Sequence, residues 1–237
     1  MEQLRRPKTL AERAVEILRN AIINNEFMLG EPLSENLLAK SIGTSKSPIR
    51  EALAQLKIEG LVNIIPQKGT FVFTLTQKEL TDLMEVRFIL ESAALRMAIE
   101  KSKDRLVQCL QTQLDGMETH LQSGDIDAYL KHDNDFHESL FICCDNQYLR
   151  DAYAQISGKS AALRTRITRQ PRHPNKTFRE HTDILKHVEK GEVEQALEML
   201  KIHFSSFMQF YQENIDQIAV STVSSTRKLR QVALEEQ

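Results

Sequence analysis

Residues 34–73 constrain the fold of this 237-residue chain more than any other segment. Apolar residues recur at helical intervals after Ser34, which can cap a helix, and Gly43 can end that helix in a left-handed conformation. A second helix begins almost at once, capped by Ser45 or Ser47. The side chains expected to face inward are Leu37, Leu38 and Ile42 in the first helix and Ile49, Leu53 and Leu56 in the second.

Two short apolar runs follow the second helix and flank a polar tip at residues 66–69. Val62 and Ile64 alternate with their neighbours before the tip, and Phe71 and Phe73 do so after it. This alternation predicts two antiparallel strands joined by the tip. Together with the two helices, the hairpin makes a winged helix-turn-helix.

Positive charge stands where such a fold meets DNA. Lys46 and Arg50 project outward near the N-terminus of the second helix, and the major groove offers guanine edges and phosphates as acceptors. The basic hairpin tip can lie along the neighbouring backbone or minor groove. The pattern therefore predicts a protein that binds double-stranded DNA.

Four motifs of this segment resemble the N-terminal domain of the GntR family of bacterial transcriptional regulators. They run from Leu38 to Gly43, from Pro48 to Leu53, from Glu59 to Val62 and from Gly69 to Val72. The resemblance implies base contacts, phosphate contacts and a wing tip, made respectively by Lys46 and Arg50, by Ser45 and Ser47, and by Lys68 and Gly69. Lys46 stands where many members carry Arg, so an ammonium group replaces a guanidinium that can donate two parallel hydrogen bonds. Asn36 stands where some relatives place a phosphate-binding Arg.

The length and composition agree with a small two-domain protein of the cytoplasm. The net charge is −2, but Lys and Arg outnumber Asp and Glu in residues 1–74 while the remainder is acidic. The three cysteines, Cys109, Cys143 and Cys144, are odd in number, which favours buried thiols over a disulfide framework. No apolar run reaches the roughly 20 residues that span a bilayer, and the N-terminus lacks the apolar core of a signal peptide. We expect a cytoplasmic protein without a membrane partner.

The rest of the chain has the pattern of a helical bundle. A helix over residues 10–25 is expected to turn inward Ala14, Ile17, Leu18, Ala21 and Ile22. After the hairpin, Thr76 and Glu79 give a capping-box signal. Six helices are predicted at residues 76–100, 103–122, 125–143, 146–169, 176–190 and 192–219. The predicted fold class is mainly α, with a winged helix-turn-helix domain (1–74), an all-α antiparallel helical bundle (75–220) and a polar tail (221–237).

Polar residues occupy positions in the bundle where the helical pattern calls for apolar ones. Asp133 and His137 lie four residues apart on one face of their helix, and His181 and His203 hold similar positions on the last two helices. One carboxylate and three imidazoles can therefore converge. Such a donor set suits a divalent transition metal, with zinc first and nickel, manganese or iron as alternatives.

The same positions resemble the FCD effector domain of FadR-type GntR regulators. The matching stretches are Asp133–Leu140, Glu180–Ile184 and Gly191–His203. The short connection between the hairpin and the Thr76 helix is similar to the six-helix, VanR-like variety of that domain. In metal-binding members, one Asp and three His at these motif positions hold the ion, which implies a metal set of Asp133, His137, His181 and His203.

The resemblance also implies an effector site. Arg87 matches an arginine that faces the cavity near the metal in several relatives, and Arg164 and Arg166 are further candidates. A guanidinium beside a metal with open positions suits a small organic acid. A helix-surface salt bridge between Arg87 and Glu91 is the alternative for that residue.

The predicted function is that of a ligand-responsive regulator that binds a pseudo-palindromic operator as a homodimer. Repression is the commoner behaviour in the family that it resembles, so we expect a repressor. In one alternative, the protein binds DNA but its metal is structural or is itself the sensed species. In another, the bundle is a metal-dependent hydrolase. The hydrolase lacks support, because no carboxylate outside the ligand set stands in a recognisable general-base motif. We therefore do not expect an enzyme.

Overall fold

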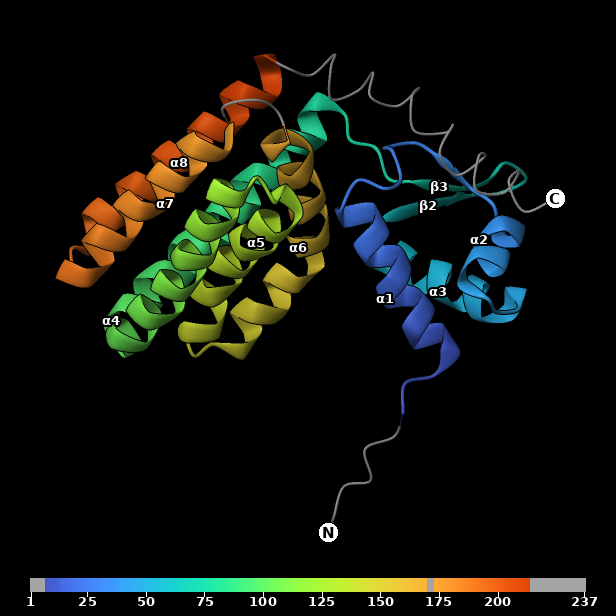
Figure 1. The fold of residues 1–237 in the computed structure, drawn as a ribbon, viewed down its shortest axis with the longest axis horizontal. Coiled ribbons are helices and arrows are strands. Elements are labelled where there is room, and N and C mark those ends of the chain that lie inside the picture. Colours follow the sequence, from blue (N-terminus) through green and yellow to red (C-terminus); the bar gives the residue numbers. More distant parts are fainter. Residues whose placement is uncertain (1–6, 170–172, 214–237) are drawn as a thin grey trace, which may run out of the picture. The chain divides into compact units, whose positions relative to one another are not determined.

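The structure, a computed structural model, describes residues 7–169 and 173–213 (Figure 1). The described residues divide into two compact units after Thr74. The predicted tail, 221–237, and the end of the last predicted helix lie outside the described residues. Over the described ranges, no helix is both long and apolar enough to cross a membrane.

The first unit is a winged helix-turn-helix. Its helices are α1 (Leu10–Ile23), α2 (Glu35–Ile42) and α3 (Lys46–Ile58), and its strands are β1 (Pro32–Leu33), β2 (Val62–Ile65) and β3 (Gly69–Val72). The strands form one antiparallel sheet in the order β1-β3-β2, in which Val62 pairs with Val72. The predicted fold class is confirmed for this unit. Strand β1 was not predicted, because two residues are too few to show a period.

Local capping explains where these helices begin and end. The Thr9 hydroxyl accepts from the Glu12 N–H in a capping box before α1, and the Ser34 side chain caps α2 as predicted. Gly43 ends α2 with a φ of 72°, in the left-handed region that favours glycine. Ser45 is the residue before α3, but its hydroxyl makes no capping hydrogen bond.

The core of the first unit differs from the predicted one at three positions. The predicted inward side chains of Leu37 and Ile17 are 61% and 47% exposed. Each has a buried neighbour, Leu38 or Leu18, and successive helical residues point about 100° apart, so only one of each pair faces the core. Ile64 is 39% exposed because it lies along the wing, beyond the part of the sheet that the helices cover.

The second unit is an antiparallel helical bundle, as predicted. Its helices are α4 (Gln77–Ser123), α5 (Ile126–Cys143), α6 (Gln147–Thr168), α7 (His173–Lys190) and α8 (Val193–Glu213). Helix α4 contains the first two predicted helices, and Ser102 between them is non-helical, with φ −152° and ψ 45°. The Ser102 hydroxyl donates to the Cys143 carbonyl at 2.5 Å, which ties this break to the end of α5.

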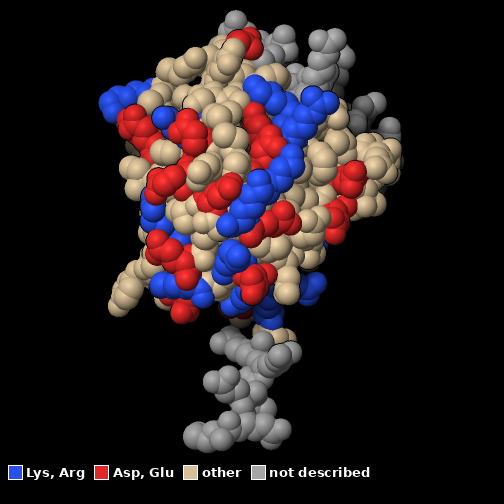
Figure 2. All heavy atoms as spheres, turned by 90° about the vertical axis from the view of Figure 1, so that its left-hand side faces the viewer, with Lys and Arg blue, Asp and Glu red and all other residues tan. Residues whose placement is uncertain are grey.

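Helix α4 packs along α5, and α7 packs along α8 (Figure 1). The apolar core between the helices includes Ala94, Leu95, Leu106, Leu110, Phe136, Leu140, Phe141, Tyr153, Ile184 and Leu200. All three cysteines are free thiols, and burial raises the pKa of Cys143 to about 12. Figure 2 shows one face of the molecule, where acidic and basic side chains alternate rather than gather by sign.

Candidate metal centre

Three histidines from three helices meet inside the second unit. His137 lies on α5, His181 on α7 and His203 on α8. One ring nitrogen of each lies within 4.8 Å of those of the other two. Their side chains are 0%, 0% and 4% exposed. The structure thus brings together the three histidines that the sequence singled out.

Asp133 lies at the edge of this group. It precedes His137 by one helical turn and is buried. Its Oδ1 is 3.9 Å from Nδ1 of His181, which is too long for a hydrogen bond. Arg164 Nε lies 3.2 Å from the other carboxylate oxygen, within ion-pair distance, but its N–H is not aimed along a hydrogen bond.

The unpartnered atoms of the cluster point to a cation. Within the described part of the chain, the buried polar atoms of this group that have no hydrogen-bond partner are Oδ1 and Oδ2 of Asp133, Nδ1 and Nε2 of His181, and Nε2 of His203. Burying a polar group without a partner is costly, and most such groups in proteins are satisfied. A divalent transition metal bound by carboxylate oxygen and imidazole nitrogen would satisfy them, so the residues fit such an ion.

The protonation of two of the histidines agrees with this fit. Burial, followed by the positive charge of Arg164, lowers the pKa of His137 well below its usual value. Burial, followed by His203, does the same to the pKa of His181. Both rings are therefore neutral at pH 7 and keep the lone pair that a metal requires. Burial raises the pKa of Asp133, although Arg164 acts to lower it.

Two carboxylates that we did not predict contact the cluster. Glu91 Oε2 lies 2.8 Å from Nδ1 of His137, and Glu180 Oε2 lies 2.9 Å from Nδ1 of His203. A signal for Glu91 existed in the sequence: it lies one turn after Arg87 on the inward face of its helix. Glu180 directly precedes His181, so helical geometry gave no reason to place it in the same site.

Arg87 is buried beside the histidines rather than on a helix surface. Its Nε donates to Glu91 at 2.6 Å, so the pair that we considered does form, but the two side chains are only 1% and 0% exposed. One terminal nitrogen lies 3.1 Å from Nε2 of His137, and the guanidinium carbon is 4.6 Å from the Phe204 ring centre. The surface interpretation of this salt bridge was therefore wrong.

The two other arginine candidates have different surroundings. Arg164 donates to the Asn134 side chain and stands beside Asp133, while its Nη1 has no partner among the described residues. Arg166 donates to the Ala162 carbonyl of its own helix at 2.7 Å. Arg164 is therefore the one of the two that the structure places at the cluster.

The predicted DNA-contacting residues are all exposed on the first unit. Ser45 directly precedes α3, and Lys46, Ser47 and Arg50 lie in its first turns. Arg50 Nε donates to Glu35 at 2.6 Å. Lys68 and Gly69 lie at the wing, where Gly69 has a φ of 113°, a conformation that disfavours other residues.

Comparison with known families accounts for both units. Residues 10–72 match the model of bacterial regulatory proteins of the gntR family, and residues 82–206 match that of the FCD domain. The chain belongs to the GntR family. It is a transcriptional regulator with a DNA-binding domain and an FCD domain, and not an enzyme.

Relatives of this GntR regulator match over most of their length. The HTH-type transcriptional regulator YdhC of Bacillus subtilis is 29% identical over 79% of this chain and 84% of its own. The HTH-type transcriptional repressor RspR of Escherichia coli is 26% identical over 90% of this chain and 96% of its own. The E. coli McbR/YncC structure, 18% identical, covers 87% of this chain and 99% of its own with a TM-score of 0.76, which shows the shared fold.

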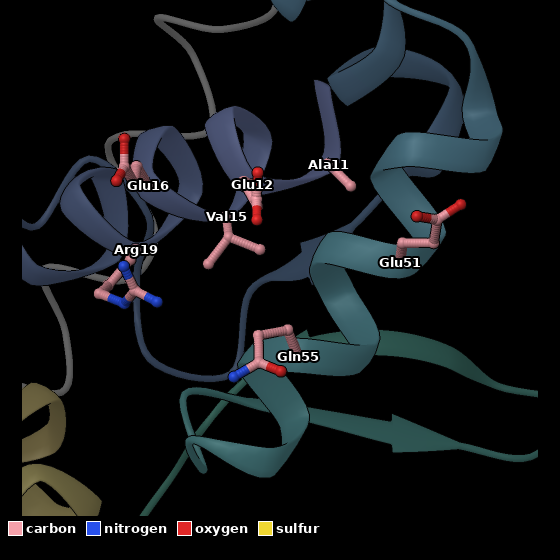
Figure 3. Close-up of a pocket in the computed structure, with 7 residues that line it drawn as sticks. All are labelled: Ala11, Glu12, Val15, Glu16, Arg19, Glu51 and Gln55. Carbon is pink, nitrogen blue, oxygen red and sulfur yellow. The ribbon is translucent and has the colours of Figure 1, made fainter. Parts of the chain in front are cut away.

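The GntR domain also carries a surface groove between α1 and α3, with a volume of about 370 Å³ (Figure 3). Its walls carry three carboxylates, those of Glu12, Glu16 and Glu51. The one cation in its lining, Arg19, is already paired with Glu59 at 2.6 Å. Such a groove disfavours an anionic ligand, so it is not the place for a small organic acid.

The histidines outside the motif show no comparable cluster in the part of the chain that the structure describes. His120 and His132 stack with ring centres 5.4 Å apart, and His187 pairs with Glu192 at 2.6 Å. These three are partly exposed, in line with their interpretation as surface residues. The side chain of His173, the fourth, lies outside the described residues.

Proposed function

We propose that this GntR regulator is a repressor that binds a pseudo-palindromic operator as a homodimer in the cytoplasm, and that its FCD domain, of the six-helix VanR-like variety, holds a divalent transition metal. The metal ligands are Asp133, His137, His181 and His203, and zinc is the first choice. The observation that supports the metal site is the set of buried polar atoms without hydrogen-bond partners on Asp133, His181 and His203.

The effector in this proposal is a small carboxylate. The basic side chains of the site are Arg87 and Arg164, its acidic side chains are Glu91, Asp133 and Glu180, and His137 and His181 are neutral. A bound divalent ion adds a Lewis-acidic centre and leaves the site with excess positive charge, which attracts an anion. In this proposal Arg164 donates to one carboxylate oxygen through Nη1, which has no partner among the described residues, and Arg87 donates to another.

Effector binding has to change the population of DNA-competent molecules. A ligand shifts such an equilibrium only by its difference in affinity for the two states, and a change from 1:99 to 99:1 requires about 5.5 kcal/mol. A carboxylate that contacts Arg87 and Arg164 in one state only gains charge-assisted hydrogen bonds of about 1.5–3 kcal/mol each in that state. Two such contacts, added to coordination, reach the required size.

The test is thermal melting of metal-loaded and chelator-stripped protein against a panel of mono- and dicarboxylic acids. A ligand at about 100 times its Kd adds roughly 2.7 kcal/mol to the unfolding free energy, which is several degrees in Tm. We expect one acid to raise the Tm of the loaded form only. The His181→Ala/His203→Ala variant should carry background metal and show no such shift, and stoichiometric metal in that variant would refute the ligand set.

A second candidate keeps the DNA-binding role but makes the metal structural, or the sensed species itself. The enclosure of the site favours it, because all four ligand side chains are between 0% and 4% exposed. In that case the same melts show a large shift with metal alone and none with any acid. DNA affinity measured with and without metal then separates a structural ion from a sensed one.

A further inference from the structure

Two of the three clustered imidazoles use one ring nitrogen to contact a carboxylate outside the proposed ligand set. His137 Nδ1 lies 2.8 Å from Glu91 on α4, and His203 Nδ1 lies 2.9 Å from Glu180 on α7. A carboxylate oxygen accepts hydrogen bonds, so each contact holds a proton on Nδ1, and a ring that binds a metal must do so through Nε2. The lone pair of each ring then resides on Nε2.

The Nε2 atoms of His137 and His203 are the ring nitrogens that the two carboxylates do not contact. Nε2 of His203 is buried and has no hydrogen-bond partner among the described residues. Nε2 of His137 lies 3.1 Å from a terminal nitrogen of Arg87, which is also 3.2 Å from Nδ1 of the same ring. In metal sites, a hydrogen bond from the second ring nitrogen to a carboxylate fixes both the tautomer and the ring orientation.

We propose, on the basis of the proposed metal-binding function, that Glu91 and Glu180 are positioning residues that fix the Nε2 atoms of His137 and His203 as metal ligands. Neither carboxylate coordinates the ion itself. Each belongs to a different helix from the histidine that it orients, so the ligand geometry depends on the packing of α4 against α5 and of α7 against α8. Helix α7 thereby supplies a ligand, His181, and the residue that orients a ligand on its neighbour.

The third imidazole is held in another way. Neither nitrogen of His181 has a hydrogen-bond partner in the described residues, but its ring stacks on Phe136 at 4.1 Å and 12°. Stacking fixes the plane of the ring without choosing between its two nitrogens. The proposal therefore assigns carboxylate positioning to His137 and His203 only.

The experiment measures the Zn²⁺ Kd of the full-length protein by competition with a chromophoric chelator. Glu180 is the residue to change first, because it is 14% exposed and its removal leaves no buried cation unpaired. We expect Glu180→Ala to weaken Zn²⁺ binding by about 10- to 100-fold. Glu180→Gln should fall between Ala and wild type, since its carbonyl still accepts the Nδ1–H.

The matched control is Glu189→Gln, an exposed position on the same helix, which should bind Zn²⁺ as tightly as wild type. Glu91→Gln, which keeps the volume of a buried side chain, tests the other histidine and should weaken binding in the same direction. A role in folding alone would lower the Tm of stripped Glu180→Ala and leave its Kd unchanged.

The outcomes separate this inference from the function on which it rests. A wild-type protein that binds one Zn²⁺ tightly, with Glu180→Ala within threefold of it, overturns the positioning role and leaves the metal site standing. A wild-type protein without stoichiometric Zn²⁺ overturns both. Weaker binding in the Ala variant with partial rescue by Gln supports the proposal.

Discussion

At the scale of single residues, a neighbouring carboxylate orients Arg50, which we predict to contact DNA bases. Its Nε is held by Glu35 at 2.6 Å, and Glu35 is the first residue of α2 while Arg50 lies in α3. The hydrogen bond uses one edge of the guanidinium and leaves the terminal nitrogens for an acceptor pair such as guanine O6 and N7. An exposed ion pair of this kind contributes little to stability, so its value lies in orientation.

Replacement of Arg50 by Ala should remove sequence-specific DNA binding and leave the fold and the metal content unchanged. The loss of one bidentate base contact costs about 1–3 kcal/mol, or roughly 5- to 150-fold in Kd. Fluorescence anisotropy with DNA selected by the wild-type protein from a random pool measures it, with scrambled DNA as reference. Lys57→Ala, near the far end of the same helix, is the control. A variant that still prefers the selected DNA would show that α3 is not the recognition helix.

At the scale of elements, helix α4 leaves no room for a side chain at Gly116, where it faces His132 of α5. A Cβ built there would lie 2.4 Å from the His132 ring. That ring is held by Gln113 at 2.9 Å and stacks on His120, so it cannot move without losing both contacts. The position of the His132 ring therefore favours glycine here, although alanine is the better helix former.

Gly116→Ala should lower the unfolding free energy by up to about 2 kcal/mol, because overpacking costs about 1–3 kcal/mol and helix propensity returns only about 1. In a His132→Ala background, the same change should raise stability by about 1 kcal/mol, since the obstruction is gone. Chemical denaturation of the four proteins measures the two effects. An equal effect in both backgrounds would contradict the contact.

The sequence predicted the helices and their ends better than it predicted contacts between side chains. Caps at Ser34 and Thr76 and the left-handed Gly43 placed helix ends within a few residues. The spacing of apolar residues could not show whether Leu37 or Leu38 is buried, because burial depends on which neighbouring helix or strand packs against α2. The converging histidines were found because a polar residue on an apolar stripe is visible in sequence. Glu91 and Glu180 were missed as partners of those histidines because each contact crosses between helices.

At the scale of the whole molecule, the buried imidazoles make the stability of the chelator-stripped protein depend on pH. The pKa values of His137 and His181 are well below 6.5 in the folded state, while the unfolded chain takes up protons near 6.5. Stability contributed by neutral burial is thus present above pH 6.5 and is lost as the pH falls below it. The raised pKa of Asp133 acts in the opposite direction at lower pH.

We therefore expect the unfolding free energy of stripped protein to fall between pH 7 and pH 5.5, by at most about 1.4 kcal/mol per pH unit for each histidine. Urea denaturation at several pH values, with ionic strength held constant, measures the slope. His181→Leu should show a smaller slope than wild type. A flat profile in the wild-type protein would mean that these rings are protonated in the folded state.

The order of the two units along the chain has a consequence during translation. A chain emerges from the ribosome beginning with its N-terminus. Helix α3 and the wing are therefore complete when residue 74 has emerged, whereas the histidine cluster also needs the chain up to residue 203. A premature stop codon or a proteolytic cut between these positions leaves a fragment with the whole DNA-reading head but without His203. We therefore expect a truncation before residue 74 to remove the DNA-binding domain, and a truncation between residues 74 and 203 to remove only the histidine cluster.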